Sequence, residues 1–105
     1  MKTVLFTRPA QEYIRTLCKA ARLEFGRMVE VLAQEGRLVA PYGEKVSGYT
    51  NLFAIRVTRG QNVRFFYAYD DGIRIYILNG YEKKSRTIPE RELRKAIAIK
   101  KELGL

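Results

Sequence analysis

The chain has 105 residues, of which 47% are hydrophobic, and its 20 Lys and Arg against 11 Asp and Glu give a net charge of +9. This length corresponds to one domain, residues 1–105, because domains most often have roughly 100–150 residues. No apolar run approaches the ~20 residues of a membrane-spanning helix, and Arg8 and Pro9 interrupt the short apolar stretch near the start, unlike a secretory signal. We therefore expect a single basic, globular, cytoplasmic domain.

The chain contains one cysteine, Cys18, and no histidine. A single thiol cannot build a disulfide framework or a Cys-rich metal site. Without imidazole there is no Ser-His-Asp triad, no Cys–His pair and no histidine zinc site. Acid–base chemistry must then come from Lys, Arg, Tyr, Asp or Glu, and we expect no metal ion and no cofactor.

The first half of the chain predicts one strand followed by helix. The run Thr3–Thr7 is rich in β-branched and apolar residues and ends at Arg8-Pro9, which indicates a strand. Apolar residues then recur along one helical stripe: Ile14, Leu17, Cys18, Ala21, Phe25, Met28, Val29 and Leu32. The stripe ends at Gly36 and fits either one helix of about 25 residues or two helices that break near Cys18. On this stripe Cys18 is expected to be a small core residue.

The second half predicts an antiparallel meander and a terminal helix. We expect a connecting loop over residues 37–51 and then three strands, at residues 52–58, 63–69 and 73–78. A last helix begins at Pro89 and runs to about Leu103. Its expected inner edge consists of Leu93, Ala96, Ile97 and Lys100. These elements predict an α+β domain in which helices cover one face of a sheet and leave the other face polar.

The positive charge lies mainly in this second half, since residues 1–44 carry a net +2 and residues 45–105 a net +7. A basic half favours an anionic partner, with nucleic acid first, because phosphates form a dense row of negative charge. The alternative is a solvated surface that keeps the protein soluble.

Two arginines are expected to be neighbours in the meander. Side-chain alternation puts Arg56 and Arg64 on the less apolar face of adjacent strands, which a short turn joins. Guanidinium groups in such a pair can bind phosphate, although surface arginines that only cover the sheet with their stems would fit the same pattern.

A second basic cluster follows the third strand of the meander. Tyr81 stands there among Lys83, Lys84 and Arg86. Rings that stack on bases, interleaved with cations that hold phosphates, are typical of RNA-binding segments. A solvated charge run before a helix is the alternative interpretation.

These segments occur in the order and spacing of one known group. The chain resembles the RelE/ParE toxin superfamily, specifically its phage-derived, HigB-like branch, which shows a Leu-aromatic-Glu-Leu-Arg strand, an Arg-rich strand ending in aromatics, and a Lys-Lys stretch before the last helix. The segments that carry the resemblance are Leu52–Arg56, Arg64–Tyr67, Asp70–Gly72 and Leu78–Pro89. Ala54 departs from the pattern, since many relatives have glutamate there.

The resemblance implies a RelE-like fold, with an N-terminal strand and a two-helix hairpin packed on the meander. It also implies the toxin of a type II toxin–antitoxin system that cleaves mRNA on the ribosome without a metal ion. Its expected partner is a cognate helix-turn-helix antitoxin, with which it would form a hetero-oligomer. Two alternatives remain: a ParE-like protein that inhibits DNA gyrase, and an inactive relative that only binds its antitoxin.

Metal-free RNA cleavage uses the ribose 2′-OH as nucleophile and needs a base, cations at the phosphate and an acid. We expect Arg56 and Arg64 to bind the phosphate. Proton transfer is assigned to Lys83 or Lys84, with Glu82 as an alternative base. The expected RNA contacts are Arg59, Tyr81 and Arg86, with Tyr81 stacking or donating a hydrogen bond.

Overall fold

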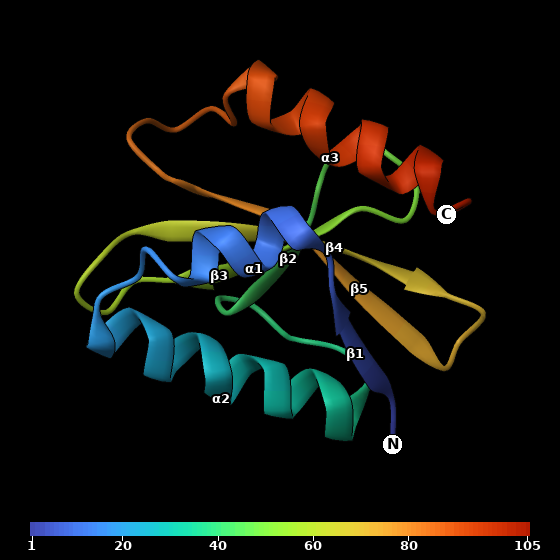
Figure 1. Ribbon diagram of the computed structural model, residues 1–105, viewed down its shortest axis with the longest axis horizontal. Helices are drawn as coiled ribbons and strands as arrows, with labels where there is room; N and C mark the ends of the chain where they lie inside the picture. Colours follow the sequence, from blue (N-terminus) through green and yellow to red (C-terminus); the bar gives the residue numbers. More distant parts are fainter.

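The computed structural model describes all 105 residues. A five-stranded sheet in the order β1-β5-β4-β3-β2 forms its centre, with helices on both faces (Figure 1). The strands are β1 (Thr3–Phe6), β2 (Gly43–Lys45), β3 (Phe53–Val57), β4 (Val63–Asp70) and β5 (Arg74–Glu82), and the helices are α1 (Arg8–Ile14), α2 (Lys19–Glu35) and α3 (Glu90–Glu102). Only β1 and β5 pair in parallel; the other strand pairs are antiparallel. The expected α+β fold is confirmed. No helix is both long enough and apolar enough to cross a membrane.

Two helices follow β1, so the single long helix is wrong and the hairpin is confirmed. The side chain of Thr7 accepts a hydrogen bond from the backbone N–H of Ala10 and begins α1. The backbone at Cys18 is extended, and its N–H donates to Gln61 Oε1 at 2.6 Å instead of continuing the helix. Cys18 is therefore an exposed N-cap residue of α2 rather than part of the core. Gly36, with φ of 78°, ends α2 in the left-handed conformation that glycine adopts without strain.

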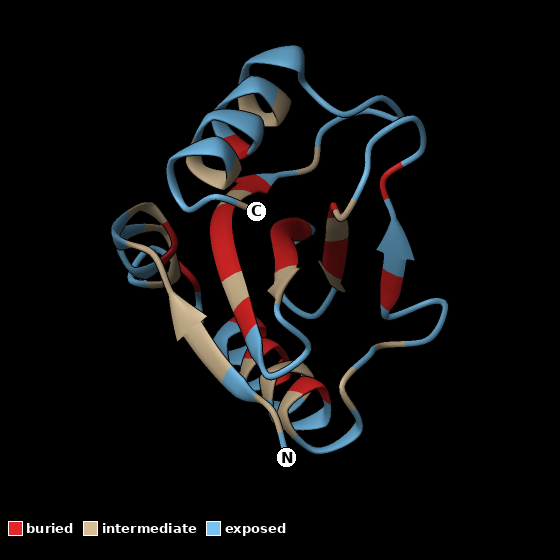
Figure 2. Ribbon diagram, turned by 90° about the vertical axis from the view of Figure 1, so that its right-hand side faces the viewer, coloured by how far each residue is buried: buried red, intermediate tan, exposed pale blue.

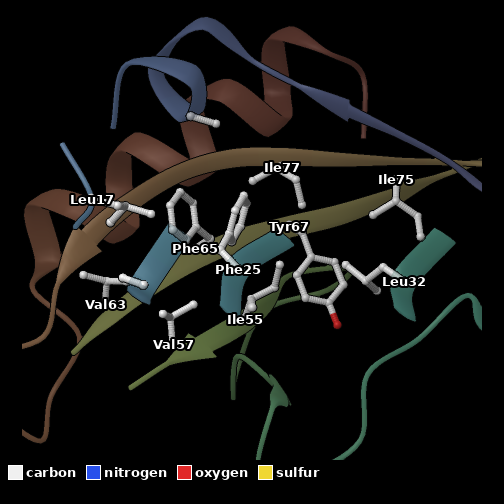
Figure 3. Packing of buried hydrophobic residues seen from close by; sticks show 12 residues of the cluster. Leu17, Phe25, Leu32, Ile55, Val57, Val63, Phe65, Tyr67, Ile75 and Ile77 are labelled. Atoms are coloured by element: carbon white, nitrogen blue, oxygen red, sulfur yellow. The ribbon is translucent and has the colours of Figure 1, made fainter. Parts of the chain in front are cut away.

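The sheet separates two apolar clusters. The larger lies between the sheet and the α1/α2 hairpin, where the rings of Phe25 and Phe65 approach to 4.2 Å between centroids (Figure 3). The smaller lies on the opposite face under α3, around Phe66 and Ala96. The buried strands lie between α2 and α3 in Figure 2. Our expectation that helices cover one face only was therefore wrong. Strand β4 carries buried apolar side chains on both of its faces, so each face is packed against helices.

Three further details of the structure differ from the prediction. The expected loop 37–51 contains β2, which at three residues is too short to show a period. The last strand of the meander continues past Leu78 to Glu82, so that Tyr81 belongs to the sheet. On α3 the side chain at the core beside Ala96 is that of Ile99, whereas Ile97 is exposed. Lys100 donates a hydrogen bond to the carbonyl oxygen of Thr50.

Helix α2 also holds the turn between β3 and β4. One carboxylate oxygen of the buried Glu24 accepts hydrogen bonds from the backbone N–H groups of Thr58 at 2.7 Å and Arg59 at 3.0 Å. With the bond from Cys18 to Gln61, this turn is attached to the helical layer at two points.

We expect Gly80→Ala to lower the free energy of unfolding by about 1–3 kcal/mol through overpacking. A Cβ at Gly80 would lie 2.5 Å from Tyr13 Cδ2 and 2.8 Å from Phe65 Cε2. The matched control is Gly26→Ala inside α2, where the added Cβ would meet no atom within 4 Å apart from the adjoining backbone of the helix itself. That variant should be more stable than the wild type by roughly 0.5–1 kcal/mol. Urea denaturation measures both changes, and a Gly80→Ala protein as stable as the wild type would contradict the close packing of α1 on β5.

Candidate functional site

One row of side chains crosses the sheet on the face that α3 covers. The strand register pairs Arg56 of β3 with Arg64 of β4, and Arg64 with Tyr81 of β5. The prediction that the two arginines are neighbours is confirmed. Tyr81 joins them because β5 is longer than expected.

The row forms the floor of a polar cleft of about 310 Å³. Strand β2 and the turn after it line one side, and the segment between β5 and α3 lines the other. Among the lining residues are five cations and a single carboxylate: Lys45, Arg56, Arg64, Lys83, Arg86 and Glu44. This composition makes the cleft suitable for a polyanion.

Arg64 is the most deeply buried of these cations, with only 5% of its side chain exposed. Burial lowers the pKa of its guanidinium from the usual range, and the neighbouring charge of Arg56 lowers it further, while Glu44 acts in the opposite direction. Glu44 Oε1 lies 3.4 Å from Arg64 Nε. This half-exposed carboxylate is the one counter-charge in contact with the buried guanidinium.

Both arginines leave hydrogen-bonding capacity unused. Arg64 Nη1 and Arg56 Nε are buried and have no partner within the chain. A buried donor without a partner typically costs about 1–3 kcal/mol, more when it is charged. An anion with several oxygens, such as a phosphodiester, would satisfy both groups with charge-assisted bonds.

Tyr81 has a ring that is almost closed to solvent. It is 6% exposed and stacks on Phe66, with ring centroids 5.6 Å apart. Burial raises the pKa of its hydroxyl, although Arg64 works against the shift, so the phenol is protonated at neutral pH. This burial favours the hydrogen-bonding role expected for Tyr81 over base stacking.

The remaining site residues from the sequence are divided between two surfaces. Lys83 and Arg86 line the cleft, and the backbone N–H of Lys83 donates to the carbonyl of Asn62 at 2.7 Å. Lys84 lies instead in a second groove between α1 and α3, where it pairs with Glu82 at 3.7 Å. The exposed Arg59 lies on the β3–β4 turn, outside the residues that line the cleft.

Sequence reasoning missed Glu44 and Lys45. Both belong to β2, which has no periodic signal, and only strand pairing brings them to the cleft. No three carboxylate or thiol groups in the chain come close enough together to hold a metal ion.

The comparisons with known proteins agree with this architecture. Residues 12–101 match the family model described as Phage derived protein Gp49-like (DUF891). The chain belongs to this family. No curated protein matches the Gp49-like chain.

Solved structures share its fold. An arginine-to-alanine double mutant of the Escherichia coli toxin RelE, in the free state, is 15% identical, with a TM-score of 0.71 over 92% of this chain and 95% of that chain. The toxin in the RelE–RelB complex from Pyrococcus horikoshii is 20% identical, with a TM-score of 0.63 over 82% of this chain and 98% of that chain. A chain of the YoeB–YefM toxin–antitoxin complex from Staphylococcus aureus is 20% identical, with a TM-score of 0.57 over 81% of this chain and 99% of that chain. At these identities the likeness establishes a RelE-like fold, which confirms the fold that the sequence resemblance implied.

The second groove supplies a test by pH. Burial and the nearby carboxylates of Glu82 and Glu92 raise the pKa of Tyr13 to about 12. Unfolded tyrosine titrates near pH ~10, so the unfolded chain loses this proton first, and stability falls as the pH rises from about 10 toward 12. The free energy of unfolding should fall by about 1 kcal/mol more for the wild type than for Tyr13→Phe, after allowance for partial exposure of the ring. Urea denaturation between about pH 9 and 12 measures the difference, and parallel curves would contradict the shift.

Proposed function

We propose that the Gp49-like protein is the toxin of a type II toxin–antitoxin pair and that it cleaves mRNA on the ribosome. The observation that carries the proposal is the neighbouring pair Arg56 and Arg64 on the floor of a cationic cleft, each of which has one buried nitrogen without a hydrogen-bond partner. The RelE-like fold and the phage-derived family support it as well. Ribosome dependence comes from the sequence resemblance to the RelE/ParE superfamily.

The residues of the cleft suit cleavage by the 2′-OH of the RNA. Arg56 and Arg64 would hold the non-bridging oxygens of the scissile phosphate, whose negative charge grows as the 2′-oxygen attacks. Lys83 lies on the same cleft and would donate a proton to the departing 5′-oxygen. Tyr81 would donate a hydrogen bond from its protonated hydroxyl, and Arg86 at the rim would attract the RNA backbone.

Lys84 and Arg59 have smaller roles in this proposal. Both lie outside the cleft that contains the paired arginines. As exposed cations they would contribute to the general attraction of ribosomal RNA rather than to chemistry.

A reconstituted translation reaction tests the activity. We expect the purified protein to cut the mRNA within its coding sequence, as mapped by primer extension, and Arg64→Met to lower the cleavage rate by roughly 100-fold or more. Arg56→Ala is the second variant, because Arg56 is less buried and its loss disturbs the fold less. Arg94→Ala is the control, since that arginine is 76% exposed on α3 and pairs only with Glu90.

Intact mRNA in the wild-type reaction would overturn the nuclease proposal. A supercoiling assay then separates the alternatives. Inhibition of DNA gyrase by the same preparation would indicate a ParE-like poison, and inactivity in both assays would indicate a relative that only binds its antitoxin.

We also propose an antitoxin as the partner. The YoeB–YefM structure from Staphylococcus aureus is a toxin–antitoxin complex, and the net charge of +9 of this chain favours an acidic partner protein. Expression of the chain alone should arrest growth, and co-expression of the product of the neighbouring reading frame should restore it. Arrest that persists with that product present, in spite of its soluble expression, would contradict the pairing.

A further inference from the structure

Glu44 occupies a position that strand pairing alone creates. It lies in β2 directly opposite Ala54 of β3, two residues before Arg56 in the adjacent strand. Ala54 is buried and small, so the longer side chain of Glu44 can extend over it toward the arginine row. The contact of 3.4 Å with Arg64 Nε shows that it does so.

Glu44 is also the only acidic residue that lines the cleft. Glu82, the other carboxylate near the site, lines the second groove and pairs with Lys84. The chain has no histidine. Every other ionisable side chain of the cleft is an arginine, a lysine or the protonated Tyr81, so Glu44 is the only carboxylate there.

The two oxygens of Glu44 have different surroundings. Oε1 is the oxygen in contact with Arg64 Nε, and no cation other than Arg64 forms an ion pair with this carboxylate. The side chain is 51% exposed, so it can be reached from the cleft. One oxygen can thus stay on the guanidinium that binds the phosphate while the other contacts the ribose next to that phosphate.

We infer that Glu44 is the general base of the RNA cleavage proposed above, accepting the proton of the attacking 2′-OH. The assignment rests on the proposed function. It gives the cleft a complete set of groups: a carboxylate base, two arginines at the phosphate and Lys83 as the acid.

The step balances without a further reactant. The 2′-OH gives its proton to Oε2 of Glu44, and the 2′-oxygen forms a bond to phosphorus. The bond between phosphorus and the 5′-oxygen breaks, and that oxygen takes a proton from the Lys83 ammonium. The products are a 2′,3′-cyclic phosphate and a 5′-hydroxyl end, and exchange with water restores both side chains.

Glu44→Gln tests the inference, because the amide oxygen can still accept a hydrogen bond from Arg64 but cannot take up a proton. We expect single-turnover cleavage of a ribosome-bound synthetic mRNA to slow by roughly 100-fold or more, as for loss of a general base. Glu44→Asp, which keeps the carboxylate, should recover part of the rate. The matched control is Glu82→Gln, whose side chain is also 51% exposed but lies outside the cleft, and it should cut at the wild-type rate.

A substrate with sulfur in place of the scissile 5′-oxygen separates base from acid. The thiolate leaves without a proton, so this mRNA should restore cleavage by Lys83→Met and leave Glu44→Gln slow. Three results would each overturn the assignment: rescue of the Glu44→Gln cleavage rate by the sulfur substrate, cleavage of the normal substrate by Glu44→Gln at the wild-type rate, or slow cleavage by Glu82→Gln. Matching thermal melting curves ensure that the variants compared are folded.

The outcome also separates this inference from the function on which it rests. If the wild type cuts and Glu44→Gln cuts equally well, the base is another group and the nuclease proposal stands. If the wild type leaves the mRNA intact, both fail together.

Discussion

The contact between Arg64 and Glu44 is the interaction on which the site depends. Arg64 belongs to β4, the central strand of the sheet, which lies between β5 and β3. Helices α1 and α2 cover one face of this strand, and α3 covers the other. A guanidinium in that position loses most of its hydration, and a second guanidinium, that of Arg56, is paired with it across the strands. One half-exposed carboxylate is a small compensation for two adjacent positive charges. The free protein therefore contains a cleft that favours the arrival of an anion.

This imbalance is compatible with a stable fold because the larger apolar cluster is separate from the charged row. The cluster around Phe25 and Phe65 lies on the opposite face of the sheet, away from the charged row. Burial of apolar side chains contributes about 1.5–3 kcal/mol each, which exceeds the cost of two unsatisfied donors when it is summed over such a cluster. The α1/α2 face thus holds the larger apolar cluster, and the α3 face contains the charged cleft.

Much of the fold could be predicted from the sequence because its elements are long enough to show a period. Alternation identified β3, β4 and β5, and a short turn was sufficient to make Arg56 and Arg64 neighbours. Glu44 could not be found in this way, since three residues of β2 show no period and their pairing partner is set by the tertiary fold. The helical pattern of α3 likewise shows that it has an apolar face but not which side of the sheet it covers. The sequence could not distinguish the roles of Lys83 and Lys84, which are adjacent and identical. In the structure both follow the end of β5, and their side chains line different grooves.

The turn between β3 and β4 connects the two layers through backbone hydrogen bonds. Glu24 and the N–H of Cys18 hold it from the helical side, and its Asn62 carbonyl accepts the N–H of Lys83 on the cleft side. Exposed turns usually accept inserted residues and fusion tags well. In this protein an insertion between Thr58 and Asn62 would shift the Asn62 carbonyl, and with it the backbone of Lys83 relative to Arg56 and Arg64. Labels and affinity tags therefore belong beside the exposed Met1 rather than in this turn, and a change in the length of the turn would alter the cleft as well as the surface.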